Sequence, residues 1–579
     1  MAVAPVFYSV SPYGAGASYD LQNNGGGTLT ISITSGVATL SVAQDGNIGV
    51  GCDIDYGAGN THVYIAPNRL GFDSGGTTEL KTGDKIEGNS SGATGIVRAI
   101  EITSGSWAGG DAAGYIYFST TTGTWQDNEQ INRTKPSSSS NICTADGTLQ
   151  GNMGNGDTQF VVKAADGSDA GNDSDDVNDI YHEYSSLSGL EAGFTDSYHI
   201  QNADLTAVAV QVFACCYYDH DNSTDDTTAV SLDWSGTTDA DNYFQCYTPV
   251  GDSESINDQR HAGKWDGDKY VLIVATGAAL TVNEDFIRIE GLQIEATRTT
   301  TAGDNCIYLN AAISTDFRAY SCLLSKGRYT VKVNQSSDAY FINNIFYDSG
   351  TGGIVTVSDS HENLILYNNT FIDNGTYGVY QTIGTILAKN NIIQNSTNSF
   401  QGTISSSSSH NVIDESAANG AFGATHSTGT ADSNTENHLV DSGATFQTDG
   451  VQVGSIVKNT TDTTYGYVTV VNSETDLTLD SDVFPDGNEN YSVYTNMYGS
   501  PTFLAEGSND FHLDSSDTVA QNKGADLTSD ATFAFWEDIE REVRSDWDVG
   551  ADEYVAPAGG VSPTGVLYGP LVGCLGGPI

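Results

Sequence analysis

Between residues 281 and 413 the chain reads Ala339-Tyr340-Phe341-Ile342-Asn343-Asn344-Ile345, then Leu364-Ile365-Leu366-Tyr367-Asn368-Asn369-Thr370, then Ile386-Leu387-Ala388-Lys389-Asn390-Asn391-Ile392, and then Ser408-Ser409-His410-Asn411-Val412. Two weaker copies precede them, at 286–292 and 317–322. From the last residue of one copy to the last residue of the next, the steps are 30, 23, 25, 22 and 20 residues. Short apolar segments at such intervals are typical of a solenoid in which each repeat forms one coil. Because each segment is brief and Gly, Asn, Asp and Ser fill the gaps, the repeat predicts strands rather than helices.

The recurring asparagine predicts a stack of amide side chains inside the solenoid. Equivalent residues of successive coils lie one strand spacing apart, about 4.8 Å. Asn also tolerates left-handed backbone geometry, which suits a bend between two strands. We therefore expect an internal hydrogen-bonded ladder of Asn344, Asn369, Asn391 and Asn411, with Gly291 and Ser321 in the equivalent positions of the earlier coils.

These repeats resemble the right-handed parallel β-helix proteins of the pectate-lyase-like superfamily. The resemblance implies the right-handed sense, which the spacing alone does not define. Small and polar residues are abundant in the chain and helix formers are scarce, so the expected fold class is all-β. We expect a right-handed parallel β-helix solenoid with small accessory β modules. A solenoid grows along one axis, so its 579 residues need not form one globular core.

The flanking sequence divides into further segments. The modules at 76–147 and near 440–496 share an order of short strands and resemble small accessory β modules of phage structural proteins. Residues 187–192 are expected to form one short helix that caps the open end of the solenoid core. The predicted segments are an N-terminal β region at 1–75, whose apolar start would anchor the chain to a partner; a small β module at 76–147; the solenoid lead-in and cap at 148–280; the coils at 281–420; an inserted small β module at 421–496; the solenoid exit at 497–555; and an uncharged apolar tail at 556–579.

The charge of the chain restricts its partners. The formal net charge is −53, from 74 acidic and 21 basic residues, which argues against a nucleic-acid partner. The simplest interpretation of this charge is a solvated acidic surface. Calcium is the only cofactor suggested, at the alternating oxygen ligands of one acidic loop: Asp219, Asp221, Asn222 and Asp225.

Two carboxylates are the only candidates for catalysis. Asp348 and Asp373 each follow a ladder asparagine by four residues and should stack on adjacent coils, roughly 5 Å apart. That spacing suits a retaining glycosidase, although Asp-Ser-Gly and Asp-Asn-Gly are also ordinary turn sequences. A lyase would need a base, and the only basic cluster in the coils is Lys326, Arg328 and Lys332, with no acidic set spaced beside it. The histidines His261, His361 and His512 lie on separate segments with no shared spacing.

The first residues have no basic region and no sustained apolar core, so no signal peptide is expected, and no apolar run is long enough to span a membrane. A β-helix without an export signal favours a virion protein that is released when the host lyses.

Three functions remain open. The first is a structural virion protein of a tailed phage, either a tail fibre or spike or a head-surface fibre or decoration, in contact with other virion proteins and with host-surface polysaccharide. The resemblance implies a homotrimer for such a protein. The second is a polysaccharide depolymerase of the tailspike kind, and the third is a cellular surface adhesin or filament subunit.

Overall fold

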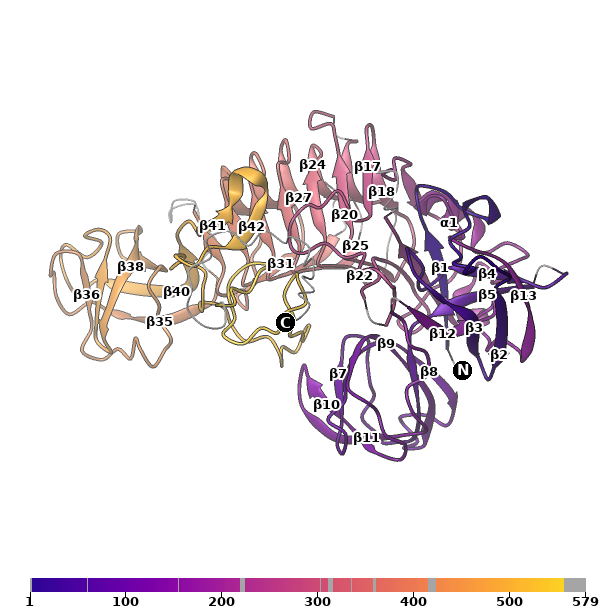
Figure 1. Ribbon diagram of the computed structural model, residues 1–579. Coiled ribbons are helices and arrows are strands. Elements are labelled where there is room, and N and C mark those ends of the chain that lie inside the picture. The colour runs from indigo at the N-terminus through magenta and orange to yellow at the C-terminus, as the bar shows by residue number, and fades with distance from the viewer. Residues whose placement is uncertain are drawn as a thin grey trace, which may run out of the picture.

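The chain forms a parallel β-helix flanked by three smaller β units (Figure 1). The computed structural model describes residues 3–556, except 60, 155, 219–223, 252, 302, 311–315, 335, 358–360 and 415–422. The parallel strands of the solenoid fall into three long sheets, which confirms the expected all-β fold class with accessory modules. The tail predicted at 556–579 lies outside the described residues beyond position 556.

Each full coil contributes one strand to each of the three sheets. The first sheet runs β1 (Ala4–Val10), β14 (Val210–Cys216), β16 (Phe244–Tyr247), β19 (Ile287–Glu290), β22 (Phe317–Tyr320), β25 (Ser336–Ile342), β28 (His361–Tyr367) and β31 (Thr385–Lys389). The second runs β17 (Val271–Val274), β20 (Gln293–Ala296), β23 (Leu323–Lys326), β26 (Ile345–Tyr347), β29 (Thr370–Ile372), β32 (Ile392–Gln394) and β34 (Val412–Ile413), and then enters the C-terminal module. The third runs β15 (Val230–Leu232), β18 (Ala278–Val282), β21 (Asn305–Leu309), β24 (Tyr329–Val333), β27 (Gly352–Thr356), β30 (Tyr377–Tyr380) and β33 (Asn398–Gln401).

The core of the solenoid follows from the alternation of side chains along each strand. In β24 and β30 the inward residues Val331, Val333 and Val379 are fully buried. Rings stack between neighbouring coils in the same way, since Phe346 and Phe371 lie 4.4 Å apart at an angle of 5°. The interior is therefore a continuous column of apolar side chains along the axis.

Two closed barrels stand at the N-terminal end of the solenoid (Figure 1). One contains β2 (Thr30–Thr34), β3 (Val37–Gln44), β4 (Asp53–Tyr56), β5 (Thr61–Ala66), β12 (Asp157–Lys163) and β13 (Asp173–Tyr181). The other contains β6 (Arg69–Gly75), β7 (Lys85–Gly88), β8 (Thr94–Ser104), β9 (Ala112–Thr122), β10 (Gln130–Lys135) and β11 (Ser139–Ala145). The second barrel thus begins at Arg69, and the first needs strands from the segment assigned to the solenoid lead-in. Antiparallel closure between distant strands leaves no local signal in the sequence, so these boundaries differ from the expected ones.

The first strand is not free to anchor the chain to a partner. β1 pairs in parallel with β14, and Val6, Tyr8 and Val10 are at most 1% exposed. The short helix α1 (Leu187–Gly193) covers the same end, with Leu187 and Leu190 buried in the same apolar cluster. Its N-terminus is capped by Ser186, and a second short helix, α2 (Leu205–Val208), precedes β14. The apolar start of the chain therefore closes its own solenoid.

The C-terminal module continues the second sheet and then turns antiparallel. It contains β35 (Thr425–Thr430), β36 (His438–Val440), β37 (Ser455–Asn459), β38 (Thr464–Ser473), β39 (Asp476–Leu479) and β40 (Asn490–Tyr498). The exit segment follows with β41 (Phe503–Ala505) and β42 (Asp510–Leu513) and returns beneath the coils toward the second barrel (Figure 1). Short 3-10 turns occur at Ala17–Tyr19 and Glu506–Ser508.

A buried ion-pair network holds the second barrel to the solenoid. Arg98 of β8 donates to Glu254 at 2.5 Å and to Glu290 of β19 at 2.6 Å. Arg260 donates to the other oxygen of Glu290 at 2.7 Å. Trp536 of the exit segment adds a bond from its indole nitrogen to the carbonyl of Gly83, at 3.0 Å. The barrel is therefore fixed against both the first sheet and the exit segment.

Candidate functional site

The four predicted ladder asparagines form a continuous chain of side-chain hydrogen bonds. The amide nitrogen of each residue donates to the amide oxygen of the next, at 3.1 Å from Asn344 to Asn369, 2.9 Å from Asn369 to Asn391 and 2.8 Å from Asn391 to Asn411. Each amide oxygen also accepts a backbone N–H, as Asn391 does from Asn369 at 3.0 Å. All four residues are fully buried. The amides thus satisfy the backbone at the bend between the first and second sheets.

A neighbouring column of residues makes the bend itself. Asn343, Asn368 and Asn390 have φ values of 56°, 50° and 57°, in the left-handed region. In the strand register they align with Gly291 and Ser321, which also have positive φ. The expectation that Gly291 and Ser321 occupy the ladder position is therefore wrong by one residue. One asparagine of each Asn-Asn pair bends the chain, and the other forms the ladder.

A fifth asparagine extends the ladder beyond the repeat. Asn411 donates to the side-chain oxygen of Asn496 at 2.9 Å, because β40 pairs in parallel with β34. Sequence reasoning missed Asn496 because the inserted module separates it from Asn411 by 85 residues. The only signal was an asparagine before Met497, in β40, the last strand of that module.

The carboxylates of Asp348 and Asp373 lie at the turns that follow β26 and β29. Both residues are exposed and have positive φ, and the register places them at equivalent positions of adjacent coils. Partial burial and then the neighbouring Asp373 carboxylate raise the pKa of Asp348. Lys326 precedes them and Asn395 follows them in the same column of left-handed turns. Asp348 and Asp373 therefore have the backbone conformation of ordinary turn residues. The same stacking also brings their two carboxyl groups to one exposed edge of the solenoid.

Of the basic cluster, Lys326 lies beside these carboxylates, and its charge opposes the rise in the pKa of Asp348. Lys326 forms an ion pair with Glu295 at 2.8 Å. Arg328 lies over the ring of Tyr329 at 5.3 Å, and Lys332 lies over the ring of Tyr308 at 4.3 Å. Their positive charges are therefore shared between an acidic partner and two aromatic rings.

The proposed calcium loop can be followed only in part. Asp219, Asp221 and Asn222 lie outside the described residues, and Asp225 is half-buried just after them. The next residue, Asp226, is 2% exposed, and its carboxylate accepts bonds from the N–H of Leu187 and the hydroxyl of Tyr270. Asp226 therefore orders the start of α1.

Partly exposed tyrosines lie on the third sheet at two ends of one register row. Tyr308, Lys332, Val355 and Tyr380 occupy one register position on four successive coils. Tyr377 stacks on Tyr380, with ring centroids 4.9 Å apart. Tyr308 and Tyr380 are three coil steps apart, which corresponds to roughly 14 Å. We call Tyr308, Lys332, Tyr377 and Tyr380 the tyrosine face.

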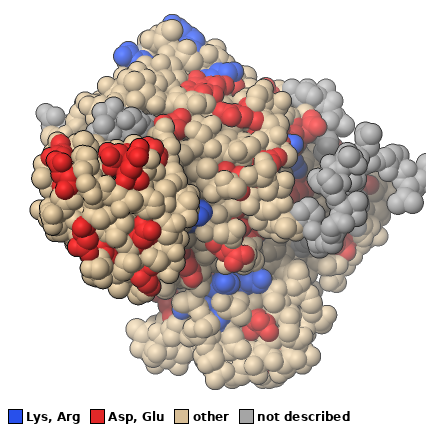
Figure 2. Space-filling view, turned by 90° about the vertical axis from the view of Figure 1, so that its left-hand side faces the viewer, with Lys and Arg blue, Asp and Glu red and all other residues tan. Residues whose placement is uncertain are grey.

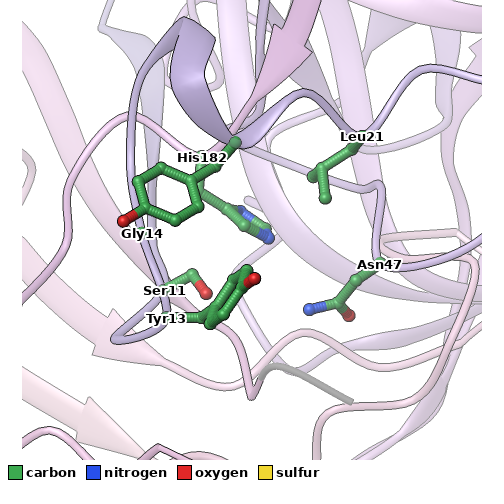
Figure 3. Close-up of a pocket in the computed structure, with 7 residues that line it drawn as sticks. Ser11, Tyr13, Gly14, Leu21, Asn47 and His182 are labelled. Carbon is green, nitrogen blue, oxygen red and sulfur yellow. The ribbon is translucent and has the colours of Figure 1, made fainter. Parts of the chain in front are cut away.

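Two hollows lie on the described part of the molecule. One, of about 10 Å³, is lined by Ser11, Tyr13, Gly14, Tyr19, Leu21, Asn47 and His182. Figure 3 shows Ser11 and Tyr13 on one side of it and Leu21 and Asn47 on the other. That volume holds about one water molecule, and a water there would reach the buried Nε2 of His182, which has no protein partner. A second, polar hollow of about 150 Å³ lies beside Thr237, Thr238 and Glu284. Neither hollow is lined by Asp348 or Asp373.

The surface carries the acidic excess of the sequence. Acidic side chains outnumber basic ones on the face shown in Figure 2 and are spread over it rather than gathered in one patch. No helix among the described residues is long and apolar enough to cross a membrane.

The comparisons with known proteins name no family. No protein-family description matches the chain, and no curated protein matches it. Among solved structures it matches the tailspike protein gp49 from Pseudomonas phage LKA1, with 8% sequence identity, a TM-score of 0.14, and coverage of 83% of this chain and 82% of that one. A similarity at this TM-score carries no argument about fold or function.

Proposed function

We propose that this chain is a structural virion protein of a tailed phage, in a tail fibre or spike or on the head surface, and that it contacts host-surface polysaccharide. A β-helix supplies a rigid shaft, and the barrels and the C-terminal module supply side surfaces for other virion proteins. The net charge of −53 suits a particle exposed to salty water and disfavours contact with the packaged nucleic acid.

The tyrosine face is the observation that carries the glycan part of the proposal. Its rings are half-buried, so each ring is held in place by its neighbours and still offers one surface to a ligand. Lys332 and the ring of Tyr308 add a hydrogen-bond donor beside an aromatic plane. Weak contacts repeated along the axis would add up on a polymer, and more so in an oligomer.

The binding test uses polysaccharide purified from the envelope of the host bacterium and affinity electrophoresis of the intact chain. We expect Tyr308→Ala and Tyr380→Ala each to weaken retardation by the polymer, and the double variant to abolish it. Tyr467→Ala is the matched control, because Tyr467 is also half-buried and contacts another tyrosine ring but lies in the C-terminal module. Equal retardation of all variants would remove the tyrosine face from the proposal.

The virion assignment has a separate test. Source material is fractionated on a density gradient, and each fraction is probed for this polypeptide and for encapsidated DNA. Banding with DNA-filled particles is the expected result. Banding with cell envelopes or DNA-free fibres would favour the surface adhesin or filament subunit instead.

A polysaccharide depolymerase is the second candidate, and the raised pKa of Asp348 beside Asp373 is the observation that favours it. A glycosidase uses two neighbouring carboxyl groups, one of which acts as the proton donor. Loss of glycan cleavage with retained binding in Asp348→Asn would support this function. A wild-type chain that cleaves no host glycan would refute the depolymerase function.

The proposed homotrimer is tested by sedimentation velocity of the full chain. A mass three times that of the 61.0 kDa chain is expected, and a monomer at all concentrations would refute it.

A further inference from the structure

Three segments of the exit region bring one histidine and two carboxylates together. His512 lies on β42, Glu540 in the turn after Trp536, and Asp552 near the end of the described chain. One ligand atom from each residue lies within 4.8 Å of the other two. The cluster was invisible in the sequence, because the residues are spaced irregularly and His512 stood apart from the other histidines.

The ring of His512 is oriented as a metal ligand would be. Its Nδ1 is hydrogen-bonded to Asp510, whose other carboxylate oxygen lies 3.3 Å from the ammonium group of Lys264. Its Nε2 is buried, has no hydrogen bond, and lies 3.3 Å from a carboxylate oxygen of Glu540. A ligating histidine commonly donates its other ring N–H to a carboxylate, which fixes the tautomer and the ring plane. Asp510 therefore leaves Nε2 directed at the carboxylates.

The space beside Nε2 is left open by a glycine. A Cβ atom at Gly263 would lie 2.4 Å from Nε2 of His512 and 3.3 Å from Cγ of Glu540. The positive φ of Gly263, 65°, also disfavours any other residue there. The lead-in segment thus closes one side of the cluster without filling it.

We propose that His512, Glu540 and Asp552 bind one Zn²⁺ ion, with Asp510 positioning His512. Zinc accepts imidazole nitrogen and carboxylate oxygen in a four-coordinate site, whereas Ca²⁺ prefers six to eight oxygen ligands. Asp552 is 6% exposed, and its carboxylate accepts a hydrogen bond from the N–H of Leu513 at 2.7 Å, so the carboxylate is already fixed in position. The side chain of Glu540 is 28% exposed and can move the short distance that coordination requires.

The location of the cluster gives the ion a structural role. The exit segment between Leu513 and Asp552 packs on the first sheet through Leu527 and Trp547. It also bonds to the second barrel through Trp536. An ion bound to both ends of this excursion would hold them, and the turn that contains Glu540, together.

The experiment measures zinc bound by the full chain. The protein is stripped with a chelator, loaded with Zn²⁺ in excess Ca²⁺ that occupies non-specific carboxylates, and gel-filtered, and the metal is then counted. We expect one zinc per chain, and with Co²⁺ instead a visible absorption typical of four-coordinate nitrogen and oxygen ligation. Glu540→Gln should weaken binding at least tenfold, as should His512→Gln, whereas Glu542→Gln, two residues from the site on an exposed side chain, should not.

Three results would overturn the proposal: no zinc retained by the wild type, zinc retained equally by Glu540→Gln, or equal displacement by Ca²⁺. Glu540→Gln alters a partly exposed residue and should fold, which far-ultraviolet circular dichroism checks. The outcome is independent of glycan binding and of virion association.

Discussion

Replacing Asn391 by alanine tests the idea that the amide ladder holds the coils together. The Asn391 oxygen accepts the backbone N–H of Asn369 at 3.0 Å, and its nitrogen donates to the carbonyl of Leu366 at 2.7 Å. Asn391→Ala would remove both of these bonds, and with them the two ladder bonds to Asn369 and Asn411, at a site with no exposed surface. A buried polar group left without its partner costs about 1–3 kcal/mol, so the two backbone groups together cost about 2–6 kcal/mol.

The matched control is Asn398→Ala on the same coil. Asn398 is half-buried, and its side chain makes a single bond of 3.3 Å to the carbonyl of Thr376. Its loss should cost no more than about 1 kcal/mol. Neither Asn391 nor Asn398 has a left-handed backbone, so the two substitutions differ in their hydrogen bonds and burial rather than in backbone strain.

The assay is equilibrium unfolding in guanidinium chloride, followed by circular dichroism and by hydrogen exchange of the coils. A solenoid can open locally, so exchange shows whether the loss centres on the coils beside Asn391. We expect faster exchange between residues 364 and 413 and a lower midpoint for Asn391→Ala. A midpoint equal to that of Asn398→Ala would refute the role given to the ladder.

Three further perturbations follow from buried charges and rings. Glu290→Gln removes the charged partner that Arg98 and Arg260 share, and it should lower the free energy of unfolding in denaturant by about 3–5 kcal/mol. The control Glu295→Gln breaks one partly exposed ion pair with Lys326 and should lower it by at most about 1 kcal/mol. Burial raises the pKa of Glu537 to about 7, so between pH 4.5 and 7 the folded chain holds a proton that the unfolded chain has lost. The stability contributed by this group therefore falls as the pH rises through that window. Glu537→Gln should flatten the decline in the free energy of unfolding that urea unfolding measures between pH 5 and pH 8. Phe346→Ala should cost about 3–5 kcal/mol, because the ring is buried and stacked on Phe371, and a thermal midpoint unchanged by this variant would contradict the close packing described for the core.

The repeat predicted the solenoid because its signal is local. Each coil carries its own apolar strand and its own Asn-Asn bend, so spacing and residue type were sufficient to expect parallel strands in register. The sequence correctly predicted that Asn344 and its equivalents on later coils form the internal ladder. It placed Gly291 and Ser321 in the ladder position, one residue away from the bend position that they occupy. A one-residue shift cannot be resolved when the flanking residues are apolar on both sides of the bend.

The parts that escaped prediction depend on contacts between distant segments. Closure of the first barrel requires β12 and β13, which follow the whole second barrel in the sequence. The cluster around His512 is assembled from β42 and two later loops, and the fifth ladder residue, Asn496, lies in the last strand of an inserted module. No periodicity connects such residues, so only the folded chain brings them together.

The pairing of β1 with β14 has a consequence for the order of events during synthesis. β1 is joined by a partner about 200 residues later in the chain. At roughly 5–20 residues per second, translation takes about 10–40 seconds to produce that partner. For this time the segment that contains Val6, Phe7 and Tyr8 has no native neighbour on the solenoid. A nascent chain of this protein should therefore need a chaperone, or should associate slowly, while β1 has no strand partner. The segment that contains β1 should be among the last parts of the coils to become protected from protease on the ribosome.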